Sequence, residues 1–333
     1  MYTDALSDGH TLELFQNDKM VFFSSGKWLH PLFQLENEFP WSDYSKDELY
    51  LHDSISGIAA ATLTIRLGIR HVYVDLISEG ALALYEMHGI CVSYKAKTER
   101  IKCVTESMID INASLDENYI KLRKKANLTS GLRLDVERLS FSYDGKRKVL
   151  DDVSFVLNSG DTVILEGENG SGKSTLIKCI LSLLKYDGKV LFDGSVGVKD
   201  TAYIKQHMDL SPYPLSCYEV VSMALGKKVG DEEIELSMRR TGCYELKDRN
   251  YFSLSGGEQE KVNIARALAG KARLLLLDEP TASLDKESKE NFVSLVSSLA
   301  FSEMPTILLV SHDKLVNDNL SWPRFHIEGG RLD

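Results

Sequence analysis

The chain of 333 residues lacks the cysteine pattern of a disulfide framework or of a zinc ribbon. It has five cysteines, an odd number, and no two of them are spaced as CxxC. Disulfide-stapled domains carry an even set of cysteines, and zinc ribbons carry closely spaced pairs. Both classes are therefore excluded, and we expect no zinc in the protein.

Long hydrophobic runs are also missing. A membrane-spanning helix needs about 20 mostly apolar residues, and the longest small-apolar stretch of the first half, residues 57–67, already contains Thr62, Thr64 and Arg66. The first four residues, MYTD, lack the basic and apolar regions of a signal peptide. We expect a cytoplasmic protein without a span of its own.

Positive charge is in deficit. Lysine and arginine number 39 against 49 aspartates and glutamates, and the formal net charge is −10. This balance disfavours nonspecific binding to nucleic acid, and no basic stretch is interleaved with aromatic residues. We expect no nucleic-acid partner. The basic cluster at residues 121–125 is interpreted as a solvated helix end or linker, the alternative being contact with a membrane or partner protein.

The first motif with clear chemistry is GENGSGKST at residues 167–175, which matches GxxxxGK[ST]. It joins a strand-like apolar run, residues 162–165, to a helical pattern at residues 176–181. Its glycines let backbone N–H groups turn toward phosphate oxygens, and the helix start adds a positive dipole end. In this motif the lysine contacts the β- and γ-phosphates, and the next hydroxyl ligates Mg²⁺. The predicted phosphate-binding residues are Gly167, Asn169, Gly170, Gly172, Lys173, Ser174 and Thr175.

A second chemical feature is the run LLLL at residues 274–277, which ends in Asp278 and Glu279. Such a run is typical of a central strand in a parallel sheet that is buried on both faces. At the carboxyl end of that strand, we predict that Asp278 holds Mg²⁺ through water and that Glu279 polarises the attacking water. Alone, the two carboxylates would fit a helix cap after Pro280. The phosphate loop upstream favours the catalytic interpretation.

Between these motifs lies LSGGEQ at residues 254–259, which resembles the signature sequence of the ATP-binding cassette (ABC) ATPases. The following residues 261–268, KVNIARAL, resemble the signature helix of that family. The serine and the two glycines expose backbone N–H groups at a helix start, which makes a second anion site without a lysine of its own. The predicted signature residues are Ser255, Gly256, Gly257 and Glu258.

Four further positions resemble elements of the same family and occur in its order. Tyr143 resembles the aromatic residue that stacks on adenine, and Gln206 resembles the Q-loop glutamine. Asp285 resembles the D-loop aspartate, and His312 resembles the switch histidine that contacts the γ-phosphate. The resemblance implies Glu279, His312 and Gln206 as catalytic residues, and Ser174, Gln206 and Asp278 as the residues that hold Mg²⁺.

The resemblance covers residues 132–333. It implies an α/β fold of the P-loop NTPase class, an ABC cassette with a mixed sheet and an inserted helical subdomain at residues 206–253. It also implies ATP and Mg²⁺ as ligands, a head-to-tail cassette dimer with itself or a paralogue, and a separate membrane permease at the cytoplasmic face. The alternative is a non-transport ABC ATPase, with an assembly or regulatory role, whose N-terminal domain binds a small molecule or a partner protein. The transported substrate and the direction of transport stay open.

A domain boundary is predicted at residues 121–131, where the basic cluster is followed by ANLTSG. Polar, small and glycine residues accumulate there, and the next residues, 132–136, alternate like the first strand of a cassette. The sequence thus predicts an N-terminal domain at residues 1–120, a linker at 121–131 and the ABC ATPase domain at 132–333.

The N-terminal part has the pattern of a small α/β domain. Two strand-like runs, residues 11–16 and 19–24, flank an Asn-Asp turn, and residues 71–77 and 90–94 form two further strand patterns. Helical spacing is present at residues 53–67 and 79–88. A hairpin followed by alternating helices and strands is typical of a small α/β domain.

Both predicted helices of this part have a capping residue. Asp53 or Ser54 is the predicted N-cap of the first helix, and Ser78 caps the second. Asp53, Ser78 and Glu79 would then lie beside free N–H groups in a cleft between two helix starts. We weigh a small polar ligand in this cleft against the simpler role of Asp53 and Ser78 as helix caps.

Residues 26–32, 53–60 and 77–90 resemble an uncharacterised domain family with a cytidine-deaminase-like fold. Zinc deaminases need a His or Cys with a Glu two residues later, then PCxxC at the next helix. Here His52 is followed by Asp53 and Ser54, and residues 78–81, SEGA, contain no cysteine. The resemblance therefore implies the fold without the deaminase reaction, because thiolate ligands for zinc are missing.

Overall fold

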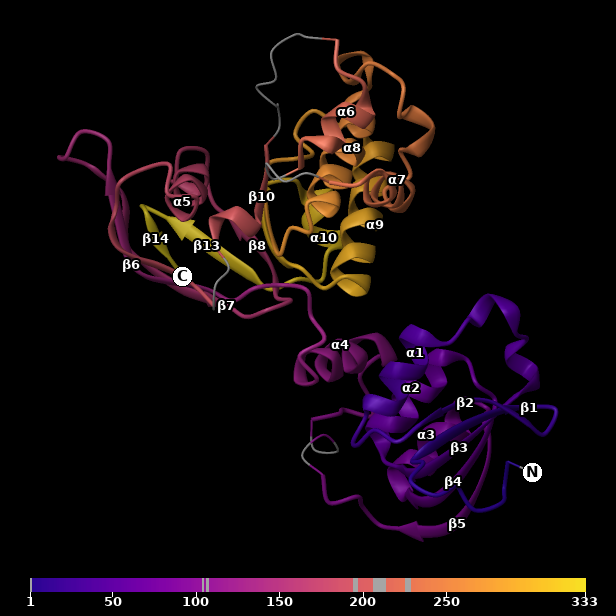
Figure 1. The fold of residues 1–333 in the computed structure, drawn as a ribbon. Helices are drawn as coiled ribbons and strands as arrows, with labels where there is room; N and C mark the ends of the chain where they lie inside the picture. The colour runs from indigo at the N-terminus through magenta and orange to yellow at the C-terminus, as the bar shows by residue number, and fades with distance from the viewer. Residues whose placement is uncertain (1, 104, 106–107, 194–196, 206–213, 225–228) are drawn as a thin grey trace. The chain divides into compact units, whose positions relative to one another are not determined.

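A computed structural model describes the chain except for residues 1, 104, 106–107, 194–196, 206–213 and 225–228. The chain forms two compact units, Met1–Leu128 and Thr129–Asp333. The division falls inside the predicted linker, but the basic cluster at residues 121–125 is the last part of a helix in the first unit (Figure 1). In the part of the chain that the structure describes, no helix has both the length and the apolar composition needed to cross a bilayer.

The first unit consists of one sheet and one layer of helices. Its elements are β1 (Leu12–Gln16), β2 (Lys19–Ser24), α1 (His30–Glu38), β3 (Leu49–Ser56), α2 (Ile58–Leu67), β4 (His71–Ser78), α3 (Glu79–Met87), β5 (Cys91–Thr98) and α4 (Leu115–Lys125).

The sheet has the order β2-β1-β3-β4-β5. β1 pairs antiparallel with β2 and β3, whereas β3, β4 and β5 run parallel. In the helical layer, α2 packs against α1, α3 and α4. The predicted small α/β domain is therefore confirmed in its architecture.

The predicted hairpin is confirmed, and its turn has a clear physical basis. Asn17 and Asp18 have φ values of 50° and 60°. The two-residue hairpin turn whose twist matches that of its strands requires positive φ at both central residues. Apart from glycine, Asn and Asp are the residues that tolerate this conformation best.

The predicted start of the first helix is wrong. Asp53 and Ser54 belong to β3, and α2 begins at Ile58 after the N-cap residue Gly57. β3 is central in the sheet and has hydrogen-bonded partners on both sides, β1 and β4. These long-range pairs outweigh the local capping preference of Asp and Ser. The second helix start is confirmed, because Ser78 Oγ accepts the N–H of Ala81 at 3.2 Å.

The second unit contains two sheets and six helices among the residues described. Its elements are β6 (Leu134–Ser142), β7 (Lys148–Leu157), β8 (Thr162–Glu166), α5 (Lys173–Ile180), β9 (Asp187–Phe192), β10 (Thr201–Lys205), α6 (Cys217–Ser222), α7 (Asp231–Arg240), α8 (Gly256–Ala269), β11 (Leu274–Asp278), α9 (Lys286–Ser302), β12 (Thr306–Val310), α10 (Lys314–Asn319), β13 (Arg324–Glu328) and β14 (Arg331–Leu332).

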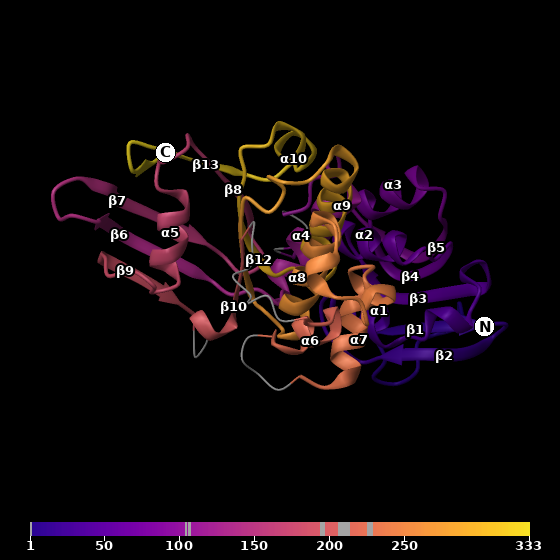
Figure 2. The ribbon, with the colours of Figure 1, turned by 90° about the horizontal axis from the view of Figure 1, so that it is seen from above.

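The larger sheet has the order β10-β11-β12-β8-β13-β14 and is parallel except for β14. The smaller sheet, β7-β6-β9, is antiparallel. α5 packs between the two sheets, whereas α8, α9 and α10 cover the other face of the larger sheet (Figure 2). The fold prediction for this part, a P-loop NTPase cassette with mixed sheets, is confirmed.

The helical part of the second unit has a core of its own. α6 and α7 pack against α8, and their shared core contains Val220, Met238 and Val262. The run at residues 274–277 is completely buried in β11, as predicted for a central strand. Because β8, β10, β11 and β12 are parallel, their carboxyl ends meet at one edge of the sheet, where ligands bind in such folds.

Candidate nucleotide site

The phosphate loop connects β8 to α5, and two of its glycines are required by close contacts. Gly167 has a φ of 154°, and a Cβ there would lie 2.4 Å from the carbonyl oxygen of Ile327. At Gly172, with a φ of 109°, a Cβ would lie 3.0 Å from the carbonyl oxygen of Val149. A larger residue would push the loop out of its curve, so the glycines fix the loop's shape.

Lys173 is held inside this loop. Its Nζ donates hydrogen bonds to the carbonyl oxygens of Gly167 at 2.7 Å and Glu168 at 2.9 Å. The side chain is buried, so its charge faces the loop interior rather than solvent. A phosphate bound in the loop would receive this cation at close range, as the motif requires.

Ser174 and Asp278 meet at the carboxyl edge of the sheet. Ser174 Oγ donates to Asp278 Oδ1 at 3.1 Å, and the Tyr203 hydroxyl donates to Asp278 Oδ2 at 3.0 Å. Hydroxyl and carboxylate oxygens are the hard ligands that Mg²⁺ prefers, so the donor set fits this cation. Tyr203 was not predicted as a site residue; its position on the strand that leads to Gln206 was the only available signal.

Glu279 and His312 form the second pair at this edge. His312 Nδ1 lies 2.7 Å from Glu279 Oε1. Glu279 has a φ of 52°, uncommon for a residue with a side chain, and its N–H donates to the carbonyl oxygen of Val310. Such backbone strain persists where the surrounding structure imposes it, often at active sites. The structure thus brings the predicted catalytic glutamate and switch histidine into direct contact, through the pairing of β11 with β12.

Tyr143 stands just after β6, near the start of α5. Its hydroxyl lies 3.3 Å from Thr175 Oγ1, and its ring packs edge-on against Phe141. The side chain is 65% exposed, which leaves a ring face free for stacking on a base. Gln206, the predicted Q-loop residue, lies outside the described residues.

The signature residues form the start of α8. Ser255 is the N-cap, and Glu258 completes a capping box. Glu258 Oε2 accepts from the backbone N–H and the hydroxyl of Ser255, each at 2.8 Å, and these bonds hold the pKa of Glu258 below its usual range. Glu258, predicted as a signature residue, thus caps its own helix, and its part in the function of the signature stays a prediction.

The two signature glycines allow α8 to approach the start of α9. A Cβ on Gly256 would lie 2.9 Å from Leu284, and one on Gly257 would lie 2.8 Å from Ser288. Asp285 caps α9 by accepting the Ser288 N–H at 2.8 Å. The signature and the D-loop therefore share one packed surface.

A buried carboxyl that the sequence did not indicate lies on the inner face of α8. Glu260 is 5% exposed, and its Oε2 has no hydrogen-bond partner among the residues described. Burial raises the pKa of Glu260 to about 8. The carboxyl borders a cavity of about 100 Å³ that Ser255 and Ser288 also line.

Glu260→Gln is expected to stabilise the protein at neutral and mildly alkaline pH. From pH 4.5 up to about 8, the unfolded chain releases the Glu260 proton while the folded chain keeps it, so wild-type stability falls as pH rises. Glutamine has no proton to release. Thermal unfolding from pH 5 to 8.5 should show that the variant has the higher free energy of unfolding. Its difference from wild type should widen with pH and exceed about 1 kcal/mol at pH 8. A constant gap, or an equal effect of the exposed control Glu290→Gln, would contradict it.

The three residues of the predicted N-terminal cleft do not line one cavity. Ser78 is buried as a helix cap, and Glu79 forms an exposed ion pair with Lys97 at 3.1 Å. The starts of α2 and α3 pack tightly, since a Cβ on Gly80 would lie 2.6 Å from the Ile58 side chain. Asp53 borders a cavity of this unit whose lining includes neither Ser78 nor Glu79.

Comparisons with known proteins agree with this geometry. A family model described as "ABC transporter" matches residues 150–282, and one described as "Domain of unknown function (DUF1893)" matches residues 4–118. The putative ABC transporter ATP-binding protein of Clostridium tetani is 35% identical over 192 residues, which are 54% of this chain and 44% of that protein. The chain thus spans less than half of that relative.

Other relatives are matched over most of their length. The zinc uptake system ATP-binding protein ZurA of Listeria innocua is 36% identical over 54% of this chain and 76% of that protein. The phosphate import ATP-binding protein PstB 1 of Yersinia pestis is 34% identical over 60% of this chain and 82% of that protein. A putative metal-chelate type ABC transporter in an inward-facing conformation superposes with a TM-score of 0.54 and 27% identity, covering 61% of this chain and 82% of that one.

The second unit therefore matches one family in both sequence and fold. The roles assigned to its phosphate loop, its carboxylates and its signature helix stay predictions. The first unit has a family model of its own, without an assigned function, and its likeness to deaminases stays a prediction. The chain belongs to the ABC transporter family, as an ATP-binding and ATP-hydrolysing protein.

Proposed function

We propose that this chain is the ATPase subunit that energises a separate membrane permease, and that its first unit is an accessory domain. The observation that carries the proposal is the cluster of Ser174, Asp278, Glu279 and His312 at one sheet edge, which brings together the side chains suited to bind Mg²⁺ and to orient water. The relatives named for zinc and phosphate import support the transport role. The substrate and the direction of transport are not part of the proposal.

In the proposed mechanism, each residue has one task. Lys173 and the loop N–H groups bind the phosphates, and Tyr143 stacks on the base. Ser174 and Asp278 would hold Mg²⁺, which would neutralise phosphate charge. Glu279 orients the attacking water. His312 keeps the Glu279 carboxylate in place through its Nδ1.

The proposal includes a head-to-tail dimer of cassettes, identical or paralogous. Ser255, Gly256 and Gly257 present N–H groups at a helix start, and the D-loop residue Asp285 is next to them. Such a surface completes a nucleotide site on a second cassette. ATP closes the dimer, and hydrolysis lets it open, which a permease converts into alternating access at the cytoplasmic face of the membrane.

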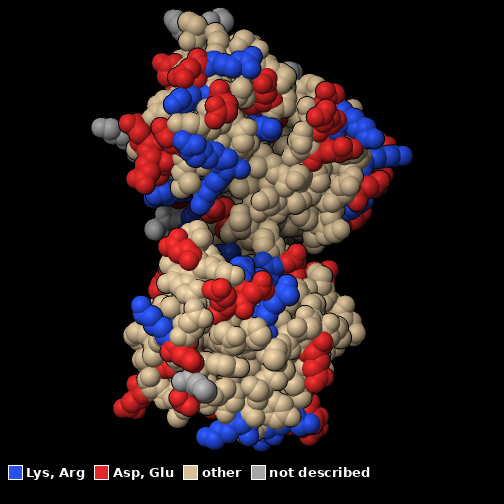
Figure 3. All heavy atoms as spheres, turned by 90° about the vertical axis from the view of Figure 1, so that its right-hand side faces the viewer, with Lys and Arg blue, Asp and Glu red and all other residues tan. Residues whose placement is uncertain are grey.

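Nucleic acid is not among the proposed partners. Figure 3 shows one face of each unit, on which lysine and arginine side chains are interspersed with aspartate and glutamate. With a net charge of −10, this mixed pattern of charges does not favour the binding of a polyanion such as nucleic acid.

The experiment is purification of the tagged chain from detergent-solubilised membranes of its own cells, with identification of any membrane protein that co-purifies. A permease that co-purifies, and whose transport in vesicles stops when ATP is omitted, would support the proposal. ATP hydrolysis by a chain that associates only with soluble proteins would instead favour the alternative, an assembly or regulatory ATPase.

We also expect the purified protein to contain less than one zinc per chain and not to deaminate cytidine or adenosine. The His52 ring is buried in β3, with Nε2 3.4 Å from Asp75, and no cysteine stands at residues 78–81. Among the described residues, no group of three His, Cys, Asp or Glu side chains is arranged to hold a metal. Elemental analysis and a deaminase assay test this. One tightly held zinc per chain would overturn it.

A further inference from the structure

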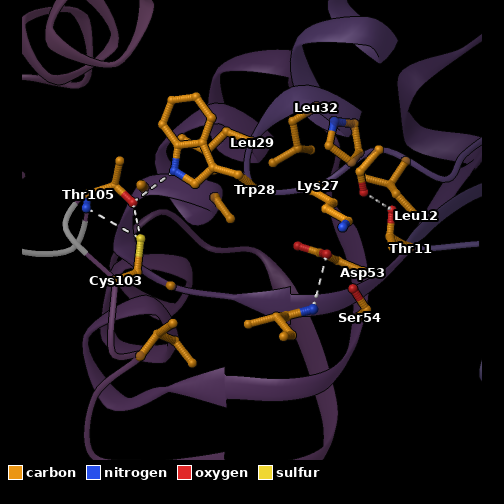
Figure 4. A pocket seen from close by; sticks show the side chains of 17 residues that line it. Thr11, Leu12, Lys27, Trp28, Leu29, Leu32, Asp53, Ser54, Cys103 and Thr105 are labelled. Atoms are coloured by element: carbon orange, nitrogen blue, oxygen red, sulfur yellow. Dashed lines mark hydrogen bonds between the residues drawn. The ribbon is translucent and has the colours of Figure 1, made fainter. Parts of the chain in front are cut away.

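The first unit contains a cavity of about 360 Å³, and Asp53 of the predicted ligand cleft is among the residues that line it (Figure 4). Its walls come from β1, the segment before α1, α1 itself, β3, the start of α2 and the segment after β5. Small-molecule sites in proteins are mostly apolar hollows of about 300–1,000 Å³ with a few well-placed polar groups. This cavity lies at the lower end of that range, which suits a small ligand.

Asp53 is a buried carboxyl in the wall of this cavity, and one of its oxygens lacks a hydrogen-bond partner among the described residues. Its side chain is 93% buried, since only 7% of it is exposed. Oδ1 accepts the N–H of Ile55 at 3.2 Å, whereas Oδ2 has no hydrogen-bond partner among the described residues. Figure 4 shows the carboxyl pointing into the cavity. A buried oxygen without a hydrogen bond lowers the stability of the fold by about 1–3 kcal/mol, so a hydrogen bond from a ligand would recover this free energy.

Most of the remaining walls are apolar, and the lining also includes Lys27, a cation at an exposed position. Leu12, Leu29 and Leu32 are buried and face the hollow from β1 and from the start of α1. Ala59 and Ala60 of α2 line it as well, and their small side chains leave the space open. A ligand that fits these walls has an apolar body, and it has its polar group at one end, where Asp53 lies.

Trp28 borders the cavity in a strained conformation. Its φ is 61°, which is an outlier for a bulky side chain, and its Nε1–H donates to Thr105 Oγ1 at 3.1 Å. The indole is 39% exposed although it is apolar, so it stands at the cavity rim rather than in a core. Backbone strain of this kind is typical of ligand clamps.

From these observations we propose that the cavity binds a small primary amine with an apolar body. The ammonium donates to the Asp53 carboxyl, and the body lies against Leu12, Leu32 and Trp28. Hydrogen bonds between two charged groups are about twice as strong as neutral ones, so an amine is favoured over an alcohol of the same shape. This inference rests on the accessory role proposed above and gives that role a ligand class.

Binding is tested on the full chain with two matched pairs, benzylamine with benzyl alcohol and cyclohexylmethylamine with cyclohexylmethanol. Saturation-transfer NMR and Trp fluorescence report binding. At least one amine should bind about tenfold more tightly than its alcohol, the gain expected of a charge-assisted hydrogen bond. The proposal fails if neither amine binds below about 10 mM, or if amine and alcohol bind equally well.

Three variants connect binding to the cavity. Asp53→Asn keeps the shape of the side chain and its bond to the Ile55 N–H, and it should remove the preference for the amine. Ile101→Trp places a large ring at a half-buried cavity position and should remove binding of both compounds. Asp47→Asn, at an exposed aspartate outside the cavity, is the control and should bind like wild type. Unchanged amine binding by Asp53→Asn would overturn the proposal.

The ligand site and the accessory role are separable by experiment. ATP turnover of the complex is measured with and without the amine that binds. If the amine changes the turnover of wild type but not that of Asp53→Asn, the result supports both the ligand site and the accessory role. Binding without any change in turnover would contradict the accessory role while supporting the site.

Discussion

Lys173→Ala should lower the affinity for ATP by about 100-fold or more. Lys173 is the only side-chain cation that the structure places inside the phosphate loop, among the residues described. Bonds from a cation to phosphate oxygens are each worth about 1.5–3 kcal/mol, and one lysine makes more than one of them. Titration calorimetry with ATP and Mg²⁺ measures the loss.

The same substitution removes two hydrogen bonds to loop carbonyls, so folding must be checked with it. Lys178→Ala is the matched control, because Lys178 lies on the same helix, α5, beyond the loop. The control should bind ATP like wild type, and both variants should keep the circular dichroism of the parent. Tight binding by a folded Lys173→Ala protein would refute the assignment of the site.

The nucleotide site could be predicted because its determinants are local in the sequence. GxxxxGK[ST] specifies both a loop shape and a cation, and the close approaches at Gly167 and Gly172 show why those positions are glycine. The run at residues 274–277 indicated a strand buried on both faces, which β11 is. Parallel pairing then brings the ends of β8, β11 and β12 together, so motifs far apart in the chain converge.

What the sequence could not provide depends on packing between distant segments. Asp53 has the local character of a helix cap, yet β1 and β4 pair with the strand that carries it. Its burial beside a cavity follows from that pairing. Glu260 likewise looks like an ordinary surface residue of α8, and the packing of other helices against α8, α9 among them, makes it a buried acid. Neither carboxyl has a sequence motif of its own.

Glu279→Gln should slow ATP hydrolysis by about 10²–10⁴-fold while leaving ATP binding intact. The amide keeps the shape of the side chain, and its oxygen can still accept from His312, whose Nδ1 lies 2.7 Å from Glu279 Oε1. What it loses is the negative charge that draws a proton from the attacking water. The reduction is measured as phosphate release at saturating ATP.

Because binding persists without turnover, this variant should accumulate the ATP-bound dimer that the proposed function requires. Light scattering after size exclusion with ATP and Mg²⁺ should show twice the monomer mass, and without nucleotide the monomer mass. Glu290→Gln, at an exposed glutamate of α9 whose weak ion pair with Lys286 spans 3.8 Å, should hydrolyse ATP at the wild-type rate. Wild-type turnover by Glu279→Gln would remove Glu279 from the chemistry. A variant that binds ATP and stays monomeric would instead contradict the pairing of two copies of this chain. The partner would then be a paralogous cassette, because in the proposed function the N–H groups at the start of α8 contact a nucleotide bound to a second cassette.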